Sequence, residues 1–392
     1  MSAECRPIAV DLFCGAGGMS LGFEQAGFDV AAAVDADPVH VAAYSLNFPD
    51  CSTVQADLAL VSGQELRDLI GLESRHIDVI FGGPPCGGFS MIGKRRPDDP
   101  RNELLLHFAR LVGELSPSCF VVENVEGLLK GPARSVLDDF VASVGDAGYS
   151  VVSPFVSLDA SGFGVPQTRR RVFIIGSNTS PWCFSHPEPT FAVEGAARRT
   201  TVWDAIGDLP NVDERDELLT SDVYCGQLGE TESAYAKILR GELDDPDDRS
   251  LRESRARNGL SGCLRTLHKA ETMERFAATR PGSYESTSRF YRLSAEGLCP
   301  TLRAGSGREH GSFTAPRPIH PVQPRCITVR EGARLQSFPD WFHFHPTKWH
   351  GFRQVGNAVP PLLARAVAKA VRAAHDRYST AVSGDEDDER RR

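Results

Sequence analysis

Short apolar segments alternate with segments of helical periodicity over the first 176 residues. This alternation restricts the possible folds more than any other feature, because strands separated by helices usually pair in parallel. The predicted strands are residues 8–13, 29–34, 51–56, 77–82, 119–124, 151–158 and 171–176. Between them, apolar residues recur at helical spacing, most clearly in 102–115. The pattern predicts a doubly wound α/β sheet, in which ligands bind at the carboxyl ends of the strands.

The alternation stops after residue 176 and regular structure returns near residue 326. Residues 177–325 are rich in Pro, Gly, Ser and Arg, and they predict a smaller, irregular domain inserted into the first one. Residues 326–378 predict a return segment that completes domain 1–176. Its last helix carries an apolar stripe, so we expect it to pack against that domain. Residues 379–392 are charged, and we expect a disordered tail.

Composition excludes several classes of protein. Hydrophobic residues make up 41% of the chain and charged residues 24%, as in ordinary globular proteins. The first residues, MSAECRPIAVDLF, lack the pattern of a signal peptide, and no apolar run is long enough to span a membrane, so we expect a cytoplasmic protein. The ten cysteines are scattered without a CxxC pair, which indicates neither a metal site nor a disulfide framework.

The charges are unevenly spread along the chain. The net charge is −9, which by itself argues against binding to nucleic acid. However, residues 211–250 contain twelve acidic and four basic residues, whereas 251–310 contain eleven basic and six acidic residues. One face of the protein can therefore bind an anionic partner, and the basic segment is the expected face.

The first predicted strand leads into a glycine-rich turn, CGAGG. Gly15, Gly17 and Gly18 permit close approach of a ligand to the N-terminus of a helix. Their spacing departs from GxGxxG and disfavours a nicotinamide dinucleotide. Asp35 and Asp57 end the second and third strands. Each carboxylate alone is typical of a solvated strand end, but together with the turn they favour an adenosine-containing ligand.

Reactive or charged residues are expected at the same edge of the sheet. Cys86 lies in the loop GGPPCGGFS, where a thiolate nucleophile and an inert structural cysteine are both open interpretations. Glu123 ends the fifth strand and is either an acid–base group or a helix cap. Arg169 and Arg171 point to one side of an extended segment and can hold a carboxylate or phosphate, although arginine runs are more often solvated.

Six motifs follow one another along the chain: DLFCGAGG, GGPPCGGFS, ENV, QTRRR, TVREGARLQSFP and QVGNAVPP. In order and spacing they resemble the motifs of cytosine-5 DNA methyltransferases of the bacterial restriction-modification type. The resemblance covers about 1–176 and 326–375. It implies an S-adenosylmethionine-dependent, Rossmann-like domain with an inserted target-recognition domain. The implied reaction transfers a methyl group to carbon 5 of a cytosine flipped out of a specific short sequence of duplex DNA.

The resemblance also implies roles for single residues. Cys86 would attack carbon 6 of the cytosine, Glu123 would contact ring nitrogen 3 and the exocyclic amine, and Arg171 with Arg169 would hold the base and that carboxylate. The residues implied to bind the cofactor are Phe13, Gly15, Gly17, Gly18, Asp35, Asp57, Pro84, Asn357 and Val359. Those implied to contact DNA are Ser90, Lys94, Arg95, Arg96, Thr301 and Arg303. No metal is implied.

One residue departs from the family pattern, because Gly87 follows the nucleophile where glutamine is usual. Two rival functions stay open. An RNA (tRNA) cytosine-5 methyltransferase would carry a Cys-Phe-Thr element, which this chain lacks. A catalytically impaired DNA-binding homologue would have no need of Cys86, Glu123 and both arginines. We expect a monomer, with a cognate restriction endonuclease as a partner that acts separately.

Overall fold

The computed structural model describes residues 6–85, 103–178, 184–191, 198–251, 259–305 and 317–391, and side chains in the last segment as far as Tyr378. Some residues singled out in the sequence lie outside the described part of the chain. They are Cys86, Gly87, Ser90, Lys94, Arg95 and Arg96.

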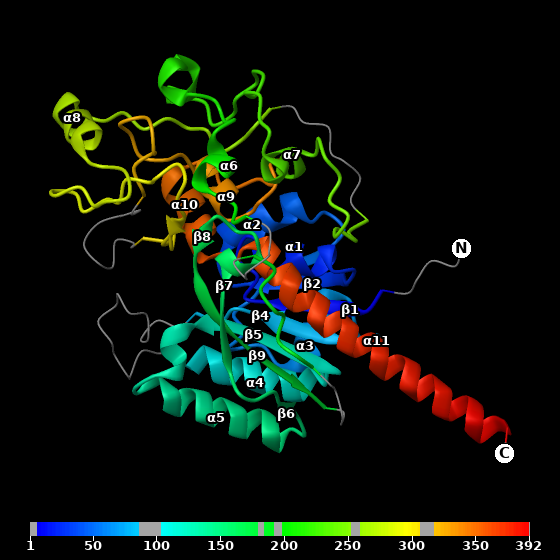
Figure 1. The fold of residues 1–392 in the computed structure, drawn as a ribbon. Coiled ribbons are helices and arrows are strands. Elements are labelled where there is room, and N and C mark those ends of the chain that lie inside the picture. The colour runs from blue at the N-terminus through cyan, green and yellow to red at the C-terminus, as the bar shows by residue number, and fades with distance from the viewer. Residues whose placement is uncertain are drawn as a thin grey trace.

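One large sheet forms the centre of the first domain (Figure 1). Its strands are β1 Ile8–Leu12, β2 Asp29–Asp35, β3 Ser52–Gln55, β4 Val79–Gly82, β5 Cys119–Val125, β6 Ser150–Val151, β7 Val156–Asp159 and β9 Arg170–Ser177. The order is β3-β2-β1-β4-β5-β9-β6, and β7 also pairs with β9. The first five strands in this order are parallel, whereas β9 runs antiparallel to its neighbours.

All seven predicted strands are present, with two differences from the expected pattern. The parallel arrangement ends at β5, because β9 returns antiparallel beside it. The predicted strand 151–158 is divided into β6 and β7, and Pro154 lies between them. Proline has no N–H group to donate to a neighbouring strand, which explains the interruption.

Helices cover both faces of the sheet. They are α1 Gly18–Gln25, α2 Pro38–Asn47, α3 Gly63–Ile70, α4 Glu103–Leu115, α5 Ala133–Asp146 and α11 Pro361–Arg391. Val10 and Leu12 of β1 share one hydrophobic cluster with α3, α4 and α5. The alternate residue Ala9 shares a second cluster with α1 and α11, since successive strand residues point to opposite faces. The domain therefore has three layers.

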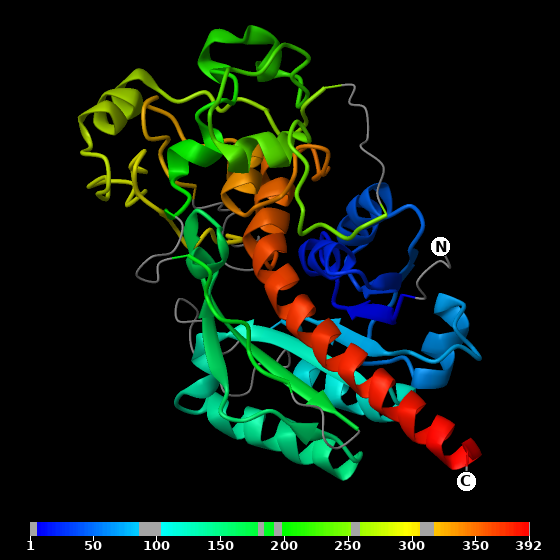
Figure 2. The ribbon, with the colours of Figure 1, turned by 45° about the vertical axis from the view of Figure 1, so that its right-hand side comes forward.

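Helix α11 packs along α1, as its apolar stripe predicts (Figure 2). The two helices approach closely at Gly22, where an added Cβ would lie 2.5 Å from the Cβ of Ala364. The backbone of α11 continues through Arg391, into the charged segment expected to be disordered. Disorder of that segment stays a prediction.

The rest of the chain has little regular structure. Its helices and short strands are β8 Gln167–Thr168, α6 Val202–Ile206, α7 Ala234–Arg240, α8 Ala270–Ala278, β10 Cys299–Pro300, α9 Val329–Leu335 and α10 Lys348–Asn357. Short 3-10 helices are η2 Glu126–Leu129, η3 Ala160–Phe163, η4 Val212–Glu214 and η5 Asp216–Leu219. One hydrophobic cluster joins α6, α9 and α10 to Cys14, Tyr44 and Phe48 of the sheet domain. α9 and α10 thus connect the two regions, and the domain boundaries stay our proposal.

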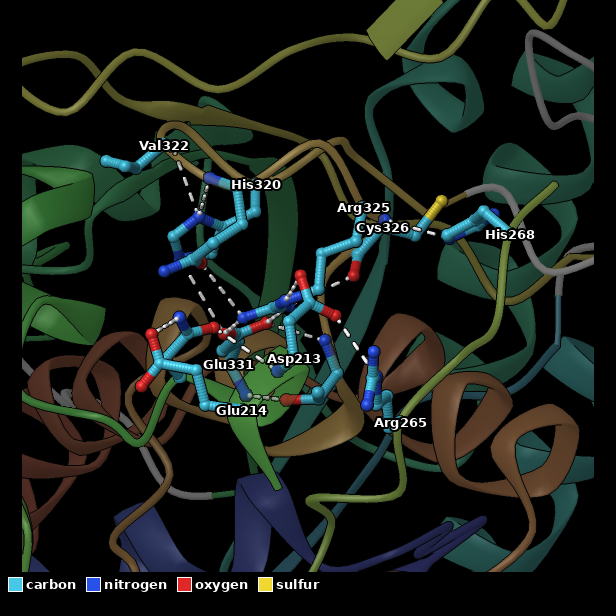
Figure 3. A network of polar contacts seen from close by, with 12 residues as sticks. Asp213, Glu214, Arg265, His268, His320, Val322, Arg325, Cys326 and Glu331 are labelled. Carbon is cyan, nitrogen blue, oxygen red and sulfur yellow. Dashed lines mark hydrogen bonds and ion pairs between the residues drawn. The ribbon is translucent and has the colours of Figure 1, made fainter. Parts of the chain in front are cut away.

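A buried charge network fixes the irregular region to the first turn of α9 (Figure 3). The Arg325 guanidinium donates to both carboxylate oxygens of Glu331, at 2.9 and 2.7 Å. The same carboxylate accepts the Thr328 N–H and so forms part of the capping box of α9. Asp213 lies 3.7 Å from Arg325, and Nε2 of His320 lies 3.7 Å from Glu331. We refer to these residues as the Arg325–Glu331 network.

Candidate active site

The glycine-rich turn joins β1 to α1 at the carboxyl edge of the sheet. Gly17 has a φ of 96° and lies so close to the Phe48 ring that an added Cβ would be 2.3 Å from it. A Cβ on Gly18 would lie 2.3 Å from the carbonyl oxygen of Val359. In contrast, no atom lies within 4 Å of the Cβ position of Gly15. Close packing thus leaves no room for a side chain at Gly17 or Gly18, whereas Gly15 borders space that a ligand can enter.

Asp35 is fixed beside this turn. Its carboxylate accepts the N–H of Gly15 at 2.9 Å and the N–H of Asp37 at 2.8 Å. Phe13 adopts a left-handed backbone with a φ of 67°, which a bulky residue rarely does. Asp57 is exposed and accepts the N–H of Ala59. The structure thus places Phe13, Gly15 and Asp35 together, with Asp57 at the exposed end of β3.

Asp37, two residues after Asp35, has a structural role. Its carboxylate caps α2 by accepting the Val39 N–H, and it pairs with Arg353 of α10 at 2.6 Å. Partial burial raises the pKa of Asp37, but the Val39 hydrogen bond, the neighbouring His40 and Arg353 outweigh it, so the pKa lies below its ordinary value. The contact ties α10 to the edge of the sheet at which Asp35 lies.

Glu123 and Arg171 form a largely buried ion pair on neighbouring strands. Nε of Arg171 lies 2.7 Å from Oε1 of Glu123, and the two side chains are 15% and 11% exposed. The approach lacks hydrogen-bond geometry, so Oε1 is buried without a hydrogen-bond partner among the described residues. Helix η2 begins after Glu123 without a side-chain cap, which excludes helix capping as the role of this carboxylate.

The loop that leads to Cys86 starts beside this pair. The Asn124 side chain donates to the carbonyl of Pro84 at 3.3 Å and accepts the Val125 N–H. A Cβ on Gly83 would lie 3.0 Å from Oε2 of Glu123. Cys86 itself lies outside the described residues. The residues that precede it are nevertheless anchored next to Glu123. Asn124 belongs to the ENV motif and was considered as a helix cap, but its role as this anchor was not predicted.

Arg169 differs from Arg171 in its partners. It is 1% exposed, and its guanidinium donates to the carbonyls of Leu302 at 3.1 Å and Asn357 at 3.4 Å. Burial and then the Arg171 charge lower its pKa well below the ordinary value, and Glu123 offsets part of this. Arg169 therefore joins the irregular region and the return segment to the strand that carries Arg171, and it makes no hydrogen bond to Glu123.

A second contact between the regions lies one step earlier in the chain. β10 pairs in parallel with β8, and the fully buried Gln167 accepts the Leu302 N–H and donates to the Leu335 carbonyl. Thr301 is exposed, and its hydroxyl donates to the Thr168 carbonyl at 2.7 Å. Gln167 was not singled out in the sequence, although its place at the start of QTRRR was the available signal.

The remaining predicted residues surround the same edge. Asn357 is exposed and Val359 is buried against Gly18. Arg303 is exposed, and its backbone packs so closely on Gly356 that a Cβ there would lie 2.4 Å from it. Within the described segments, no group of three or more His, Cys, Asp or Glu residues could hold a metal ion. Those segments also contain no helix that is long and apolar enough to cross a membrane.

Comparison with known proteins places this chain in a family. The model of the C-5 cytosine-specific DNA methylase family matches residues 8–373. The Type II methyltransferase M.XorII of Xanthomonas oryzae pv. oryzae is 51% identical over 92% of this chain and 84% of its own length. The Type II methyltransferase M1.HphI of Haemophilus parahaemolyticus is 35% identical over 92% of this chain and 86% of its own length.

Solved structures agree with these matches. A crystal structure of a protein assigned as a DNA modification methyltransferase encoded within a prophage (E. coli) is 34% identical, with a TM-score of 0.76 over 94% of this chain and 99% of that one. The structure of the S. pombe Dnmt2 methyltransferase is 15% identical, with a TM-score of 0.55 over 95% of this chain and 100% of that one. At this identity the similarity shows the fold alone. Because the family match spans nearly the whole chain, the protein belongs to the C-5 cytosine-specific DNA methylase family.

Proposed function

We propose that the protein methylates carbon 5 of cytosine within a specific short sequence of duplex DNA, with S-adenosylmethionine as the methyl donor. Its family is that of DNA (cytosine-5-)-methyltransferases, and its relatives are Type II enzymes of restriction-modification systems. The observation that carries the proposal is the largely buried Glu123 carboxylate, an acceptor that Arg171 holds at 2.7 Å beside the residues that lead to Cys86. The exocyclic amine and a protonated ring nitrogen 3 of cytosine are the donors that such an acceptor needs.

In the proposed mechanism Cys86 is the nucleophile. Its thiolate forms a bond to carbon 6 of the cytosine, and the electrons of the 5,6 double bond make carbon 5 nucleophilic. Glu123, held by Arg171, keeps a proton at ring nitrogen 3 and so limits the negative charge on the ring. S-adenosylmethionine, when bound, supplies an electrophilic methyl group. Loss of the carbon 5 proton to a base then expels the Cys86 thiolate. Because a stacked base is out of reach, the cytosine must be flipped out.

The cofactor fits the edge formed by the glycine turn. Space is open at Gly15, and α1 begins at Gly18 without a side-chain cap on its free N–H groups. We propose that Asp35 binds the ribose hydroxyls and Asp57 the adenine amine, while Phe13, Pro84, Asn357 and Val359 complete the pocket. Gly17 and Gly18 shape the turn. This assignment is supported by the hydrogen bond between Asp35 and Gly15 and by the contact of Val359 with Gly18.

DNA is proposed to bind between the sheet domain and residues 177–325. Among the expected DNA contacts, Arg303 is exposed and available, whereas the Thr301 hydroxyl is already used within the protein. The proposals for Ser90, Lys94, Arg95 and Arg96 concern residues outside the described part of the chain. We further propose that the protein acts in the cytoplasm as a monomer without a metal ion, and that a separate restriction endonuclease recognises the same sequence.

Bisulfite sequencing tests this function directly. Purified protein is incubated with S-adenosylmethionine and plasmid DNA, in parallel with Cys86→Ser. The wild type is expected to protect cytosine within one short motif, and the variant is expected to protect none. Absence of methylation on every DNA, with cofactor binding intact, would overturn the proposal. Methylation confined to RNA would favour the RNA methyltransferase instead.

A further inference from the structure

Asp35 is the carboxylate assigned above to the ribose, and three groups of the protein already contact it. Oδ2 accepts the N–H of Gly15 at 2.9 Å. Oδ1 accepts the N–H of Asp37 at 2.8 Å and lies 3.4 Å from Nδ1 of His40. The side chains of His40 and Asp35 are 9% and 14% exposed, so water competes little for their contact. The two oxygens of this carboxylate therefore have unequal surroundings.

His40 belongs to the first turn of α2, and this turn is fixed in place. The N–H of His40 bonds to the carbonyl of Asp37 at 3.0 Å, and the Asp37 carboxylate caps the helix and pairs with Arg353 of α10. The Gln354 side chain of α10 donates to the carbonyl of Val39 at 3.3 Å. The imidazole is thus held beside the end of β2 by a helix start that α10 anchors.

The two nitrogens of the His40 ring have different partners. Oδ1 of Asp35 is an acceptor, so Nδ1 carries the proton and donates it. Nε2 is buried and has no hydrogen-bond partner among the described residues. A buried polar atom that is left unpaired costs stability, whereas a leucine fills a similar volume without this cost. Stability alone thus does not explain a histidine at this position, and the polar contact that its ring makes is to Asp35.

The acceptor sites of Asp35 show what is left for a ligand. A carboxylate offers about four sites, about two on each oxygen. Among the described residues, Asp37 and His40 fill the sites of Oδ1, whereas Gly15 fills one site of Oδ2. The free site is therefore on Oδ2, next to Gly15, whose Cβ position has open space around it. The cofactor is proposed to enter this space.

We propose that His40 is a positioning residue for S-adenosylmethionine: its Nδ1 occupies Oδ1 of Asp35, so that Oδ2 alone accepts a hydrogen bond, from one of the two ribose hydroxyls. This inference rests on the proposed function and narrows its ribose assignment to a single hydroxyl. Without the imidazole, Oδ1 has a free acceptor site and only two backbone N–H groups orient the carboxylate. The ligand then has to order Asp35 as it binds, which lowers affinity.

Binding of three ligands to the wild type tests the single-hydroxyl contact. S-adenosylhomocysteine, its 2′-deoxy analogue and its 3′-deoxy analogue are titrated into the protein by calorimetry, without DNA. Loss of the hydroxyl that Oδ2 accepts is expected to raise Kd about 10-fold or more, because a charged acceptor is left unpaired. Loss of the other hydroxyl is expected to raise Kd by less than about threefold. Equal Kd values for the two analogues would overturn the proposal.

Substitution of His40 tests the positioning role. His40→Leu removes the donor at similar volume and is expected to raise Kd for S-adenosylhomocysteine about 10-fold. It leaves Kd unchanged for the weaker-binding deoxy analogue, which has no hydroxyl for Oδ2 to accept. The KM for S-adenosylmethionine rises by the same factor as Kd, while kcat at saturating cofactor stays within about twofold of wild type.

Two further variants serve as controls. His40→Asn keeps a side-chain N–H donor close to the place of Nδ1, and it is expected to restore Kd to within about threefold of wild type. Ser45→Ala is the matched control on the same helix. It removes a hydrogen bond to the Val41 carbonyl without touching Asp35, and it is expected to keep the Kd of wild type.

The outcomes separate this inference from the proposed function. If His40→Leu weakens all three ligands by the same factor, His40 only supports the shape of the pocket, and the inference is wrong while the function stands. The same conclusion follows if His40→Leu binds S-adenosylhomocysteine as tightly as wild type. Thermal denaturation shows whether each variant is folded, and the two deoxy analogues decide the question on wild type if His40→Leu is not. A wild type that binds no S-adenosylhomocysteine would remove the proposed function as well.

Discussion

Arg169, Arg170 and Arg171 are neighbours in the chain, and each is held by a different partner. Arg171 is paired with Glu123, Arg169 is buried on two backbone carbonyls, and Arg170 points outward to Asp159 at 3.4 Å. Extended backbone explains the alternation, because successive side chains point to opposite faces. The sequence therefore predicted which arginines share a side. It could not predict that Arg169 binds carbonyls from residues 302 and 357, which are distant in the chain.

The different surroundings of Arg171 and Arg170 predict that their substitutions lower the rate of catalysis to different extents. Arg171→Ala is expected to lower kcat about 100-fold or more, because Glu123 loses the group that fixes it beside the base. Arg170→Ala is the matched control and should change kcat by less than about fivefold, since exposed ion pairs contribute little. Single-turnover methyl transfer measures both variants, with thermal denaturation to confirm folding. Equal losses in the two variants would show that Arg171 has no special role.

The last part of the acidic stretch 211–250 forms one element, residues 241–250, which we call the acidic strap. Its Arg249 N–H bonds to the Gln25 carbonyl of α1 at 2.8 Å, and Asp245 and Asp247 each lie 2.5 Å from a cation of α11. A cavity of about 1030 Å³ lies between the strap, α7 and α11, and it includes neither Gly15 nor Glu123. The strap is thus held to the sheet domain mainly by charges.

Two cations of α11 should contribute differently to this attachment. Arg365 and Asp245 are 11% and 14% exposed, whereas Lys369 and Asp247 are 37% and 63% exposed. Arg365→Ala is expected to lower the free energy of unfolding by about 1–3 kcal/mol, because it leaves a carboxylate poorly solvated and unpaired. Lys369→Ala should cost less than about 1 kcal/mol. Urea denaturation measures the free energy of unfolding of both variants. At 1 M salt the difference between the two variants should become smaller. A larger loss from Lys369→Ala would contradict this account.

Elements were predictable where the pattern is local. All seven strands follow from apolar runs, and the stripe on α11 predicted its packing, because burial on a face leaves a periodic signal. The β8–β10 pair was not predictable, since two residues of each strand meet across more than a hundred residues of chain. In the candidate site, Glu123 and Arg171 were singled out and do meet. The anchors Asn124 and Gln167 lie within the motifs ENV and QTRRR, but the sequence does not show which backbone groups they bind.

At the scale of the whole molecule, buried charge joins the irregular region to the rest. In the Arg325–Glu331 network, burial raises the pKa of Glu331, but Arg325 outweighs it and lowers the pKa to about 2. Burial lowers the pKa of His320 to about 4, against the attraction of Glu331. Its Nδ1 accepts two backbone N–H groups, from Val322 and Gln323, so the ring is held in its neutral form.

Both shifts make the folded protein sensitive to acid. In the unfolded chain His320 has its ordinary pKa of 6.5, whereas in the folded protein it is protonated only near pH 4. Because the unfolded chain binds this proton first, the free energy of unfolding falls as the pH drops from 6.5 to 4. Glu331 adds a loss from pH 4.5 towards 2, where the unfolded carboxylate is protonated first. The loss due to His320 is on the order of 3 kcal/mol once the pH is below 4.

The variant His320→Asn tests the first of these effects. Asparagine does not titrate, and its carbonyl can accept the same backbone N–H groups, so the free energy of unfolding should depend less on pH between 6.5 and 4. Other histidines with lowered pKa values, such as His186 and His268, leave part of the dependence in place. Urea denaturation at several pH values compares wild type and variant. An unchanged pH dependence would remove His320 from the explanation.

The contact of Val359 with Gly18 has a consequence for protein synthesis. The glycine turn and α1 leave the ribosome early, whereas the wall of their pocket and the helix that covers Gly22 are made near the end of the described chain. A growing polypeptide therefore lacks a closed pocket at the glycine turn while most of its other residues are already translated. We therefore expect modification of DNA to start only after the return segment has been translated.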